Sequence, residues 1–177
     1  MTVSFDQPVD HILESDHKEL DELLAKAAGS VRSADLNAAY HDVDRFWARL
    51  AMHIRAEHLR LFPFVRTAAE TDLHDHEMPA ILEGLRVDHD FFMRELARAI
   101  KALRLVFDFG NAEETFALVG HILSEVRERL DEHNRVEETI VYPVATEKFL
   151  SPADLADLTS SVKKELDNYP QRFKEDN

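Results

Sequence analysis

The chain has 177 residues, with 35 acidic and 21 basic side chains, a formal net charge of -14 and no cysteine. This length predicts a single domain with one hydrophobic core. The excess of negative charge excludes nucleic acid and anionic membrane surfaces as expected partners, because it would be repelled by them. The lack of cysteine excludes disulfides, thiolate nucleophiles and sulfur-ligated metals. Any bound metal must therefore have nitrogen and oxygen ligands.

The N-terminal stretch MTVSFDQPVDHILESDHKEL has no apolar segment typical of a secretion signal. Elsewhere no apolar run approaches the roughly 18 residues that a membrane-spanning helix needs. We therefore expect a cytoplasmic protein. Only 4 glycines and 6 prolines are available for turns, which favours a few long secondary-structure elements.

Four apolar stripes with the alternating three- and four-residue steps of amphipathic helices follow one another along the chain. They cover residues 13–27, 39–64, 82–106 and 116–144. Gly29 and Ser30 predict the end of the first helix, and Gly110 predicts the end of the third. No segment shows the alternation of a strand. The sequence therefore predicts an all-α fold, an up-down-up-down four-helix bundle.

The predicted connections contain recognisable capping residues. Ser33 or Asp35 is a suitable N-cap for the second helix, and the polar segment 67–79 ends in a proline suited to the first turn of the third helix. Asn111 followed by Glu114 resembles a capping box at the start of the fourth helix.

A further helix is predicted near the C-terminus, beginning after Ser151 and packing on the bundle. We assign residues 1–177 to one domain, with the bundle over about 10–147 and the C-terminal helix over about 152–168.

The two halves of the chain repeat one another. In the second and fourth helices, Leu50, His53, Glu57 and Pro63 have the same spacing as Leu130, His133, Glu137 and Pro143. In the first and third helices, Asp16, His17, Leu20 and Leu24 have the same spacing as Asp88, His89, Phe92 and Leu96. The chain is therefore predicted to form two related helical hairpins. Each brings one His and one His-x-x-x-Glu to the same level of the core.

Residues four apart on a helix project to the same side, so His53 with Glu57 can bind one centre, as can the equivalent pair in the fourth helix. An ionised carboxylate in an apolar core costs several kcal/mol unless it is paired or protonated. A bound cation removes this cost. A buried network of His-Glu hydrogen bonds without metal is the alternative interpretation.

The predicted metal ligands are His17, His53, Glu57, His89, His133 and Glu137. Four imidazoles and two carboxylates suit iron, manganese or zinc better than calcium or magnesium. Two ions that share two bridging carboxylates, with two imidazoles each, would leave room for a solvent bridge and a small ligand. Ferritin-like di-iron bundles use Glu-x-x-His instead, so the spacing here argues against that class.

The ordered set of His17, two His-x-x-x-Glu pairs and His89, with LFP after the first pair and VYP after the second, resembles the hemerythrin-like (HHE cation-binding) family over about residues 10–147. The resemblance implies a four-helix bundle that holds two non-haem iron ions on the six residues. It also implies a role in handling dioxygen, peroxide, nitric oxide or iron.

Two positions depart from the oxygen-carrying hemerythrins. Those proteins place a second His four residues after the third-helix His, where this chain has Met93, and they end with His-x-x-x-x-Asp, where this chain has Glu137 and then Glu138. With the fifth imidazole missing, we expect redox or catalase-like chemistry on a peroxide or diatomic ligand. The alternative is a module that binds or senses oxygen, nitric oxide or iron without turnover. No catalytic residue is predicted beyond the ligands.

Other polar residues receive weaker predictions. Asp16 and Asp88 are expected to face solvent or an adjacent helix, with the orientation of a neighbouring imidazole as the alternative, and Glu138 is expected to contact a ligand or an interface rather than a metal. The remaining histidines are expected at the surface or rim, or in a solvated loop, without a role. These are His11, His41, His58, His74, His76 and His121.

Overall fold

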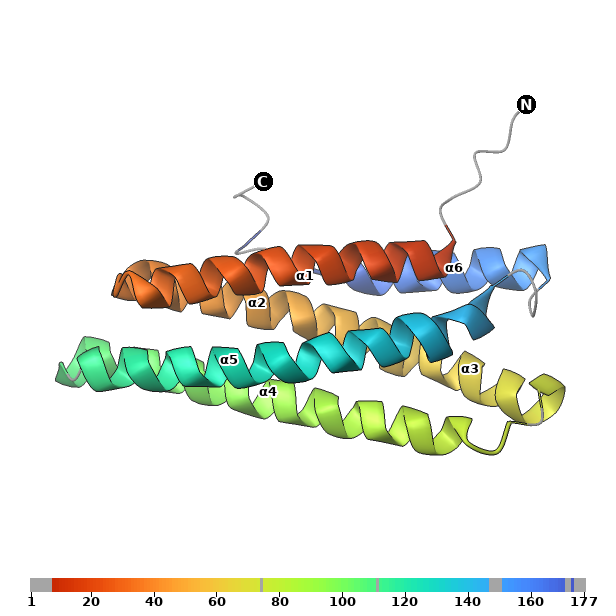
Figure 1. The fold of residues 1–177 in the computed structure, drawn as a ribbon. Coiled ribbons are helices and arrows are strands. Elements are labelled where there is room, and N and C mark those ends of the chain that lie inside the picture. Colours follow the sequence, from red (N-terminus) through yellow and green to blue (C-terminus); the bar gives the residue numbers. More distant parts are fainter. Residues whose placement is uncertain (1–7, 74, 111, 147–150, 171–172, 174–177) are drawn as a thin grey trace, which may run out of the picture.

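The computed structural model describes residues 8–73, 75–110, 112–146, 151–170 and 173. Its long helices are α1 (Val9–Arg32), α2 (Leu36–Ala56) with its continuation α3 (Phe62–Ala68), α4 (Met78–Phe109) and α5 (Ala112–Val136), and a shorter α6 (Pro152–Leu166) follows. Consecutive long helices run antiparallel, and the α1–α2 hairpin lies against the α4–α5 hairpin (Figure 1). The described residues contain no strand. The predicted all-α bundle is confirmed.

The end of the first helix was predicted wrongly. α1 continues through Gly29 and Ser30 to Arg32, and the chain turns only at Ala34, whose φ is 54°. A glycine inside a helix costs only about 1 kcal/mol. The extra turn buries Val31 in the core, which offsets that cost. Of the two predicted N-caps of α2, Ser33 and Asp35, the structure has Asp35. Its side chain accepts a hydrogen bond from the backbone N–H of Ala38 at 3.0 Å.

The predicted connection over 67–79 is shorter in the structure. The helix continues past Thr67 and ends with a π-helical turn (Ala69–Leu73), because Ala68 and Ala69 are buried in the core. The proline of this segment does lie in the first turn of α4, as predicted. Gly110 ends α4 in the left-handed conformation with a φ of 82°, also as predicted. The capping box cannot be checked, because residue 111 lies outside the described residues.

Two further π-helical turns interrupt the helices at equivalent points, Glu57–Leu61 and Glu137–Val141. Each is closed by a hydrogen bond from the backbone N–H five residues ahead, from Phe62 to the carbonyl of Glu57 and from Tyr142 to that of Glu137. A proline follows each aromatic residue, and proline both lacks an N–H and clashes with the carbonyl four residues before it. The wider turn relieves this conflict.

The extra residue in each π-turn shifts the helical register, which corrects one predicted core position. Ile140 was placed on the apolar stripe of the fourth helix, yet 42 % of its surface is exposed, whereas Val141 is fully buried. Beyond this point a short 3-10 helix (Tyr142–Ala145) ends the bundle. The shift therefore turns Tyr142, rather than Ile140, toward the core.

The core consists of two apolar clusters. One is formed by Val9, Leu13, Leu61, Phe62, Val65, Leu82, Leu85, Val141 and Val144 with residues of α6. The other is formed by Leu20, Leu24, Phe46, Leu50, Phe92, Leu96, Leu103, Leu123, Val126 and Leu130. On α1, His17 lies between Leu13 of the first cluster and Leu20 of the second. A layer of buried polar residues that includes His17 therefore separates the two clusters.

The C-terminal helix packs on α1 and α2, as predicted. Leu158, Val162 and Leu166 are buried in the first cluster. Ser151 caps the helix by accepting a hydrogen bond from the backbone N–H of Asp154 at 3.2 Å. Among the described residues, no helix is both long enough and apolar enough to cross a membrane.

We expect the core aromatic Phe46, which is fully buried, to be a principal contributor to stability. Phe46→Ala should lower the free energy of unfolding by about 3–5 kcal/mol, because it removes buried apolar contacts and leaves a cavity. Chemical denaturation measures this change. Phe107→Ala is the matched control, because half of the Phe107 surface is exposed. An equal loss in both variants would contradict this description of the core.

Candidate metal centre

Six side chains meet in the polar layer between the two apolar clusters. They are His17 of α1, His53 of α2, Glu57 of the first π-turn, His89 of α4, His133 of α5 and Glu137 of the second π-turn. None has more than 3 % of its surface exposed. The structure thus brings together all six residues that the sequence predicts as ligands. Their binding of metal stays a prediction.

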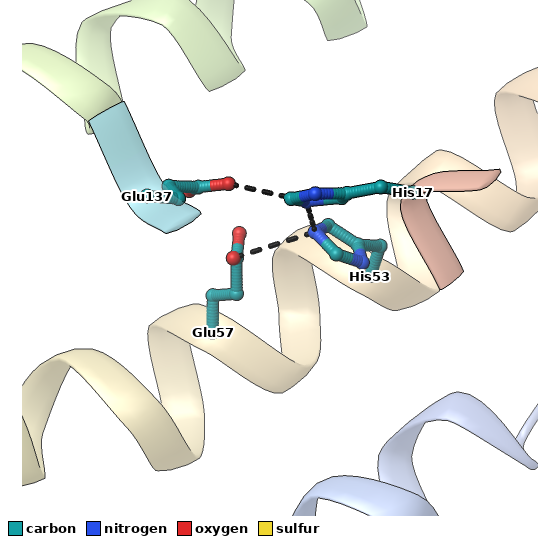
Figure 2. Close-up of side chains that lie close together, drawn as sticks. All are labelled: His17, His53, Glu57 and Glu137. Atoms are coloured by element: carbon teal, nitrogen blue, oxygen red, sulfur yellow. Dashed lines mark hydrogen bonds and ion pairs between the residues drawn. The ribbon is translucent and has the colours of Figure 1, made fainter. Parts of the chain in front are cut away.

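The six residues form two groups that share both carboxylates. One group is His17, His53, Glu57 and Glu137, and the other is Glu57, His89, His133 and Glu137. Within each group the potential ligand atoms all lie within 4.8 Å of one another. Figure 2 shows the first group, in which the two imidazoles and the two carboxylates point toward one another from α1, α2 and the two π-turns. This arrangement could hold two cations with two bridging carboxylates.

The imidazoles of the first group direct their Nε2 atoms at each other. His53 Nδ1 lies 2.8 Å from Asp16 Oδ2, and His17 Nδ1 lies 2.8 Å from Glu138 Oε1. A carboxylate only accepts hydrogen bonds, so Nδ1 is the donor in each ring, and a ring that binds a metal would use its Nε2 lone pair. These two Nε2 atoms are 3.1 Å apart. A cation between them would be bound by both nitrogens.

The second group has the same geometry. His133 Nδ1 lies 3.2 Å from Asp88 Oδ2, and its Nε2 lies 2.9 Å from His89 Nε2. The Nδ1 of His89 faces another imidazole, that of His58, at 2.8 Å. Each of the four ring Nε2 atoms is therefore directed into the centre.

One oxygen of each shared carboxylate lies close to an imidazole nitrogen without forming a regular hydrogen bond to it. Glu57 Oε2 and Glu137 Oε1 are buried and have no hydrogen-bond partner among the described residues. An unpaired buried carboxylate oxygen loses its hydration without compensation. These oxygens lie 3.3 Å from His89 Nε2 and 3.0 Å from His133 Nε2. The residues present thus fit a pair of metal ions.

A comparison with known protein families identifies the family of this chain. The model of the family described as the Hemerythrin HHE cation binding domain matches residues 9–146. The chain belongs to this family. Searches among curated proteins and among solved structures found no match. The predicted resemblance is confirmed, and cation binding by this hemerythrin domain agrees with the two His-Glu groups.

Charged residues behind the ligands fix their orientation in this hemerythrin domain. Asp16 accepts from His53 and from Arg49, and Asp88 accepts from His133 and from Arg129. Each aspartate therefore orients an imidazole of the other helix in its hairpin. This is the alternative that the sequence analysis did not favour. Such contacts fix the tautomer and the ring direction of a metal-binding His.

The sequence analysis missed one residue of the centre, Tyr142. Its hydroxyl oxygen lies 2.9 Å from Glu57 Oε1, 3.0 Å from His17 Nε2 and 3.3 Å from Glu137 Oε2. Burial and the two carboxylates raise the pKa of Tyr142 well above its usual value of 10.0. Its single proton can serve only one of these acceptors at a time. The VYP motif was the available signal, but a regular α-helix would have turned Tyr142 away from Glu137.

The prediction for His58 was wrong, because this residue contacts His89 and is half-buried rather than without a role. Burial and the neighbouring His89 lower its pKa. His11, His41, His76 and His121 are not buried, as predicted, and residue 74 lies outside the described part. Glu138, expected to contact a ligand or an interface, does contact His17.

Without metal, the protonation of the cluster is set by the balance between burial and the charges of neighbouring side chains. Burial would lower the pKa of His53, but the carboxylates of Glu57 and Asp16 raise it well above 6.5. Burial would raise the pKa of Glu57, but the imidazoles of His53 and His89 hold it well below 4.5. The metal-free cluster is thus stabilised by imidazolium-carboxylate pairs.

We expect opposite pH dependences with and without metal. Since the folded pKa of His53 is raised, its contribution to stability is complete below about 6.5 and is lost as the pH rises through the folded pKa. Since the folded pKa of Glu57 is lowered, its contribution is complete above about 4.5 and is lost as the pH falls through the folded pKa. The metal-free protein should therefore be most stable between these values, lose the contribution of His53 as the pH rises and lose that of Glu57 as the pH falls. The loaded protein should gain stability with pH, because protons compete with the metal.

Melting curves across this range, recorded with and without metal, measure both slopes. His53→Gln should flatten the alkaline loss of the metal-free protein, whereas His121→Gln, at an exposed position, should not. Identical slopes for the loaded and metal-free proteins would contradict metal binding at these residues.

Proposed function

We propose that this hemerythrin domain is a non-haem di-iron protein that reacts with peroxide, dioxygen or nitric oxide, with peroxide decomposition as the favoured activity. The observation that carries the proposal is that Glu57 and Glu137 belong to both His-Glu groups. A shared pair of carboxylates supports two neighbouring ions, whereas six ligands on one ion would leave no open position. The bridged arrangement thus favours chemistry that uses two metal ions.

Bound iron would supply the redox and Lewis-acid chemistry that the protein side chains lack. The nitrogen and carboxylate donors suit iron, although manganese and zinc share this preference. Family membership and the ordered ligand motif support iron. The protein contributes four directed imidazoles, two bridging carboxylates and a cover of apolar side chains that excludes bulk water.

The surroundings of the centre support turnover over reversible oxygen carriage. Met93, where the oxygen carriers have a fifth histidine, packs against the second apolar cluster. Each His-Glu group then has only two imidazoles, which leaves a position for a small ligand. Tyr142 holds a proton at Oη beside the ligand atoms, and its raised pKa keeps this hydroxyl available as a hydrogen-bond donor to an oxygen-containing ligand.

We expect fully loaded protein to hold two iron ions per chain. Glu57→Gln should reduce the content of both ions, because each group uses this carboxylate. Glu125→Gln, on an exposed part of α5, is the matched control and should leave two ions bound. Elemental analysis of anaerobically loaded protein measures the content. One ion in the wild type, or none, would contradict the proposal.

We also expect the iron-loaded protein to release dioxygen from added hydrogen peroxide, and the metal-free protein to release none. An oxygen electrode measures this at equal protein concentrations. If the reduced protein instead binds dioxygen reversibly through repeated cycles and does not decompose peroxide, the domain is a binding or sensing module.

A further inference from the structure

The two His-Glu groups are related by the internal repeat, but their surroundings differ at two equivalent positions. The residue after each shared glutamate is His58 in one half and Glu138 in the other, and the aromatic residue that closes each π-turn is Phe62 in one half and Tyr142 in the other. Other contacts are conserved between the halves, including the Arg-Asp pairs behind His53 and His133. The repeat thus provides an internal comparison of the two metal positions.

The first difference concerns the acceptor behind the α1 and α4 imidazoles. His17 Nδ1 faces the carboxylate of Glu138 at 2.8 Å, whereas His89 Nδ1 faces the ring of His58 at the same distance. A carboxylate behind a metal-binding imidazole makes the ring a stronger donor and fixes its tautomer. A neutral imidazole supplies no charge. His17 is therefore the better donor of the two.

The second difference concerns the aromatic residue. Tyr142 places its hydroxyl oxygen 3.0 Å from His17 Nε2, so an additional oxygen lies beside the His17–His53 position. Both aromatic rings stack on the neighbouring imidazole, Tyr142 on His17 with centroids 5.6 Å apart and Phe62 on His89 with centroids 5.9 Å apart, but Phe62 brings no polar atom. Both differences therefore favour a cation at the same position.

We infer that the two metal positions are unequal, and that the His17–His53 position binds its ion first and more tightly than the His89–His133 position. This inference rests on the proposed two-metal centre. At metal concentrations between the two dissociation constants, the chain holds one ion. The weaker position then determines when the two-metal form exists.

Calorimetric titration of the metal-free full chain with Fe²⁺ under anaerobic conditions, repeated with Co²⁺, tests the inference. We expect two steps whose dissociation constants differ about ten-fold or more, which is the size of effect that contacts behind a ligand produce. Glu138→Gln should weaken the tight step about ten-fold and leave the weak step unchanged. Glu138 is exposed, so the substitution does not disturb the core.

A reciprocal variant assigns the second step. His58→Glu places a carboxylate behind His89 and should strengthen the weak step, with the tight step unchanged. Glu125→Gln removes the same charge from an exposed part of α5 and should change neither step.

Each outcome decides between distinct conclusions. Two equal steps in the wild type, or a Glu138→Gln variant in which the tight step is unchanged, would overturn the inequality and leave the two-metal proposal intact. Binding of one ion or none by the wild type would overturn both.

Discussion

The placement of two carboxylates in the middle of an apolar bundle is the constraint on which the rest of the centre depends. Glu57 and Glu137 are completely buried, and each has an oxygen that finds no hydrogen-bond partner in the described part of the chain. Four imidazole Nε2 atoms point at the same region. In a bundle stabilised mainly by two apolar clusters, this layer is tolerable only when positive charge compensates it, either as bound cations or as protons on the imidazoles. The residues that need this compensation are the same ones that we propose as cation ligands.

The π-turns link this constraint to the backbone. Each begins at a shared glutamate, and its extra residue directs the following aromatic side chain into the same layer. A proline after the aromatic residue explains why the turn widens at this point rather than elsewhere. The X-Pro sequence thus places the hydroxyl of Tyr142 beside His17 and the phenyl ring of Phe62 against His89. π-turns are common at functional sites for this kind of reason.

The sequence was sufficient for the features that depend on regular periodicity. Steps of three and four residues located the long helices, and the internal repeat brought His53 with Glu57 and His133 with Glu137 to one level of the core. It was insufficient where tertiary burial or irregular turns took precedence. Burial of Val31 carried α1 past Gly29, and the π-turns displaced Ile140 and brought in Tyr142. The contact between His58 and His89 also joins helices that lie far apart in the sequence, so no pattern within one helix could reveal it.

The repeat explains both the common and the divergent features of the centre. A bundle of two related hairpins contains two equivalent sets of polar residues. The proposed ligands and the Arg-Asp pairs behind His53 and His133 are the same in both sets. The differences are confined to neighbours of the ligands, His58 against Glu138 and Phe62 against Tyr142, where a substitution changes charge and polarity without removing a donor. In the proposed two-metal centre, a change at such a neighbour would alter one metal position and leave all six ligands in place. Divergence around the proposed ligands, rather than among them, would therefore be the route by which this fold specialises each position.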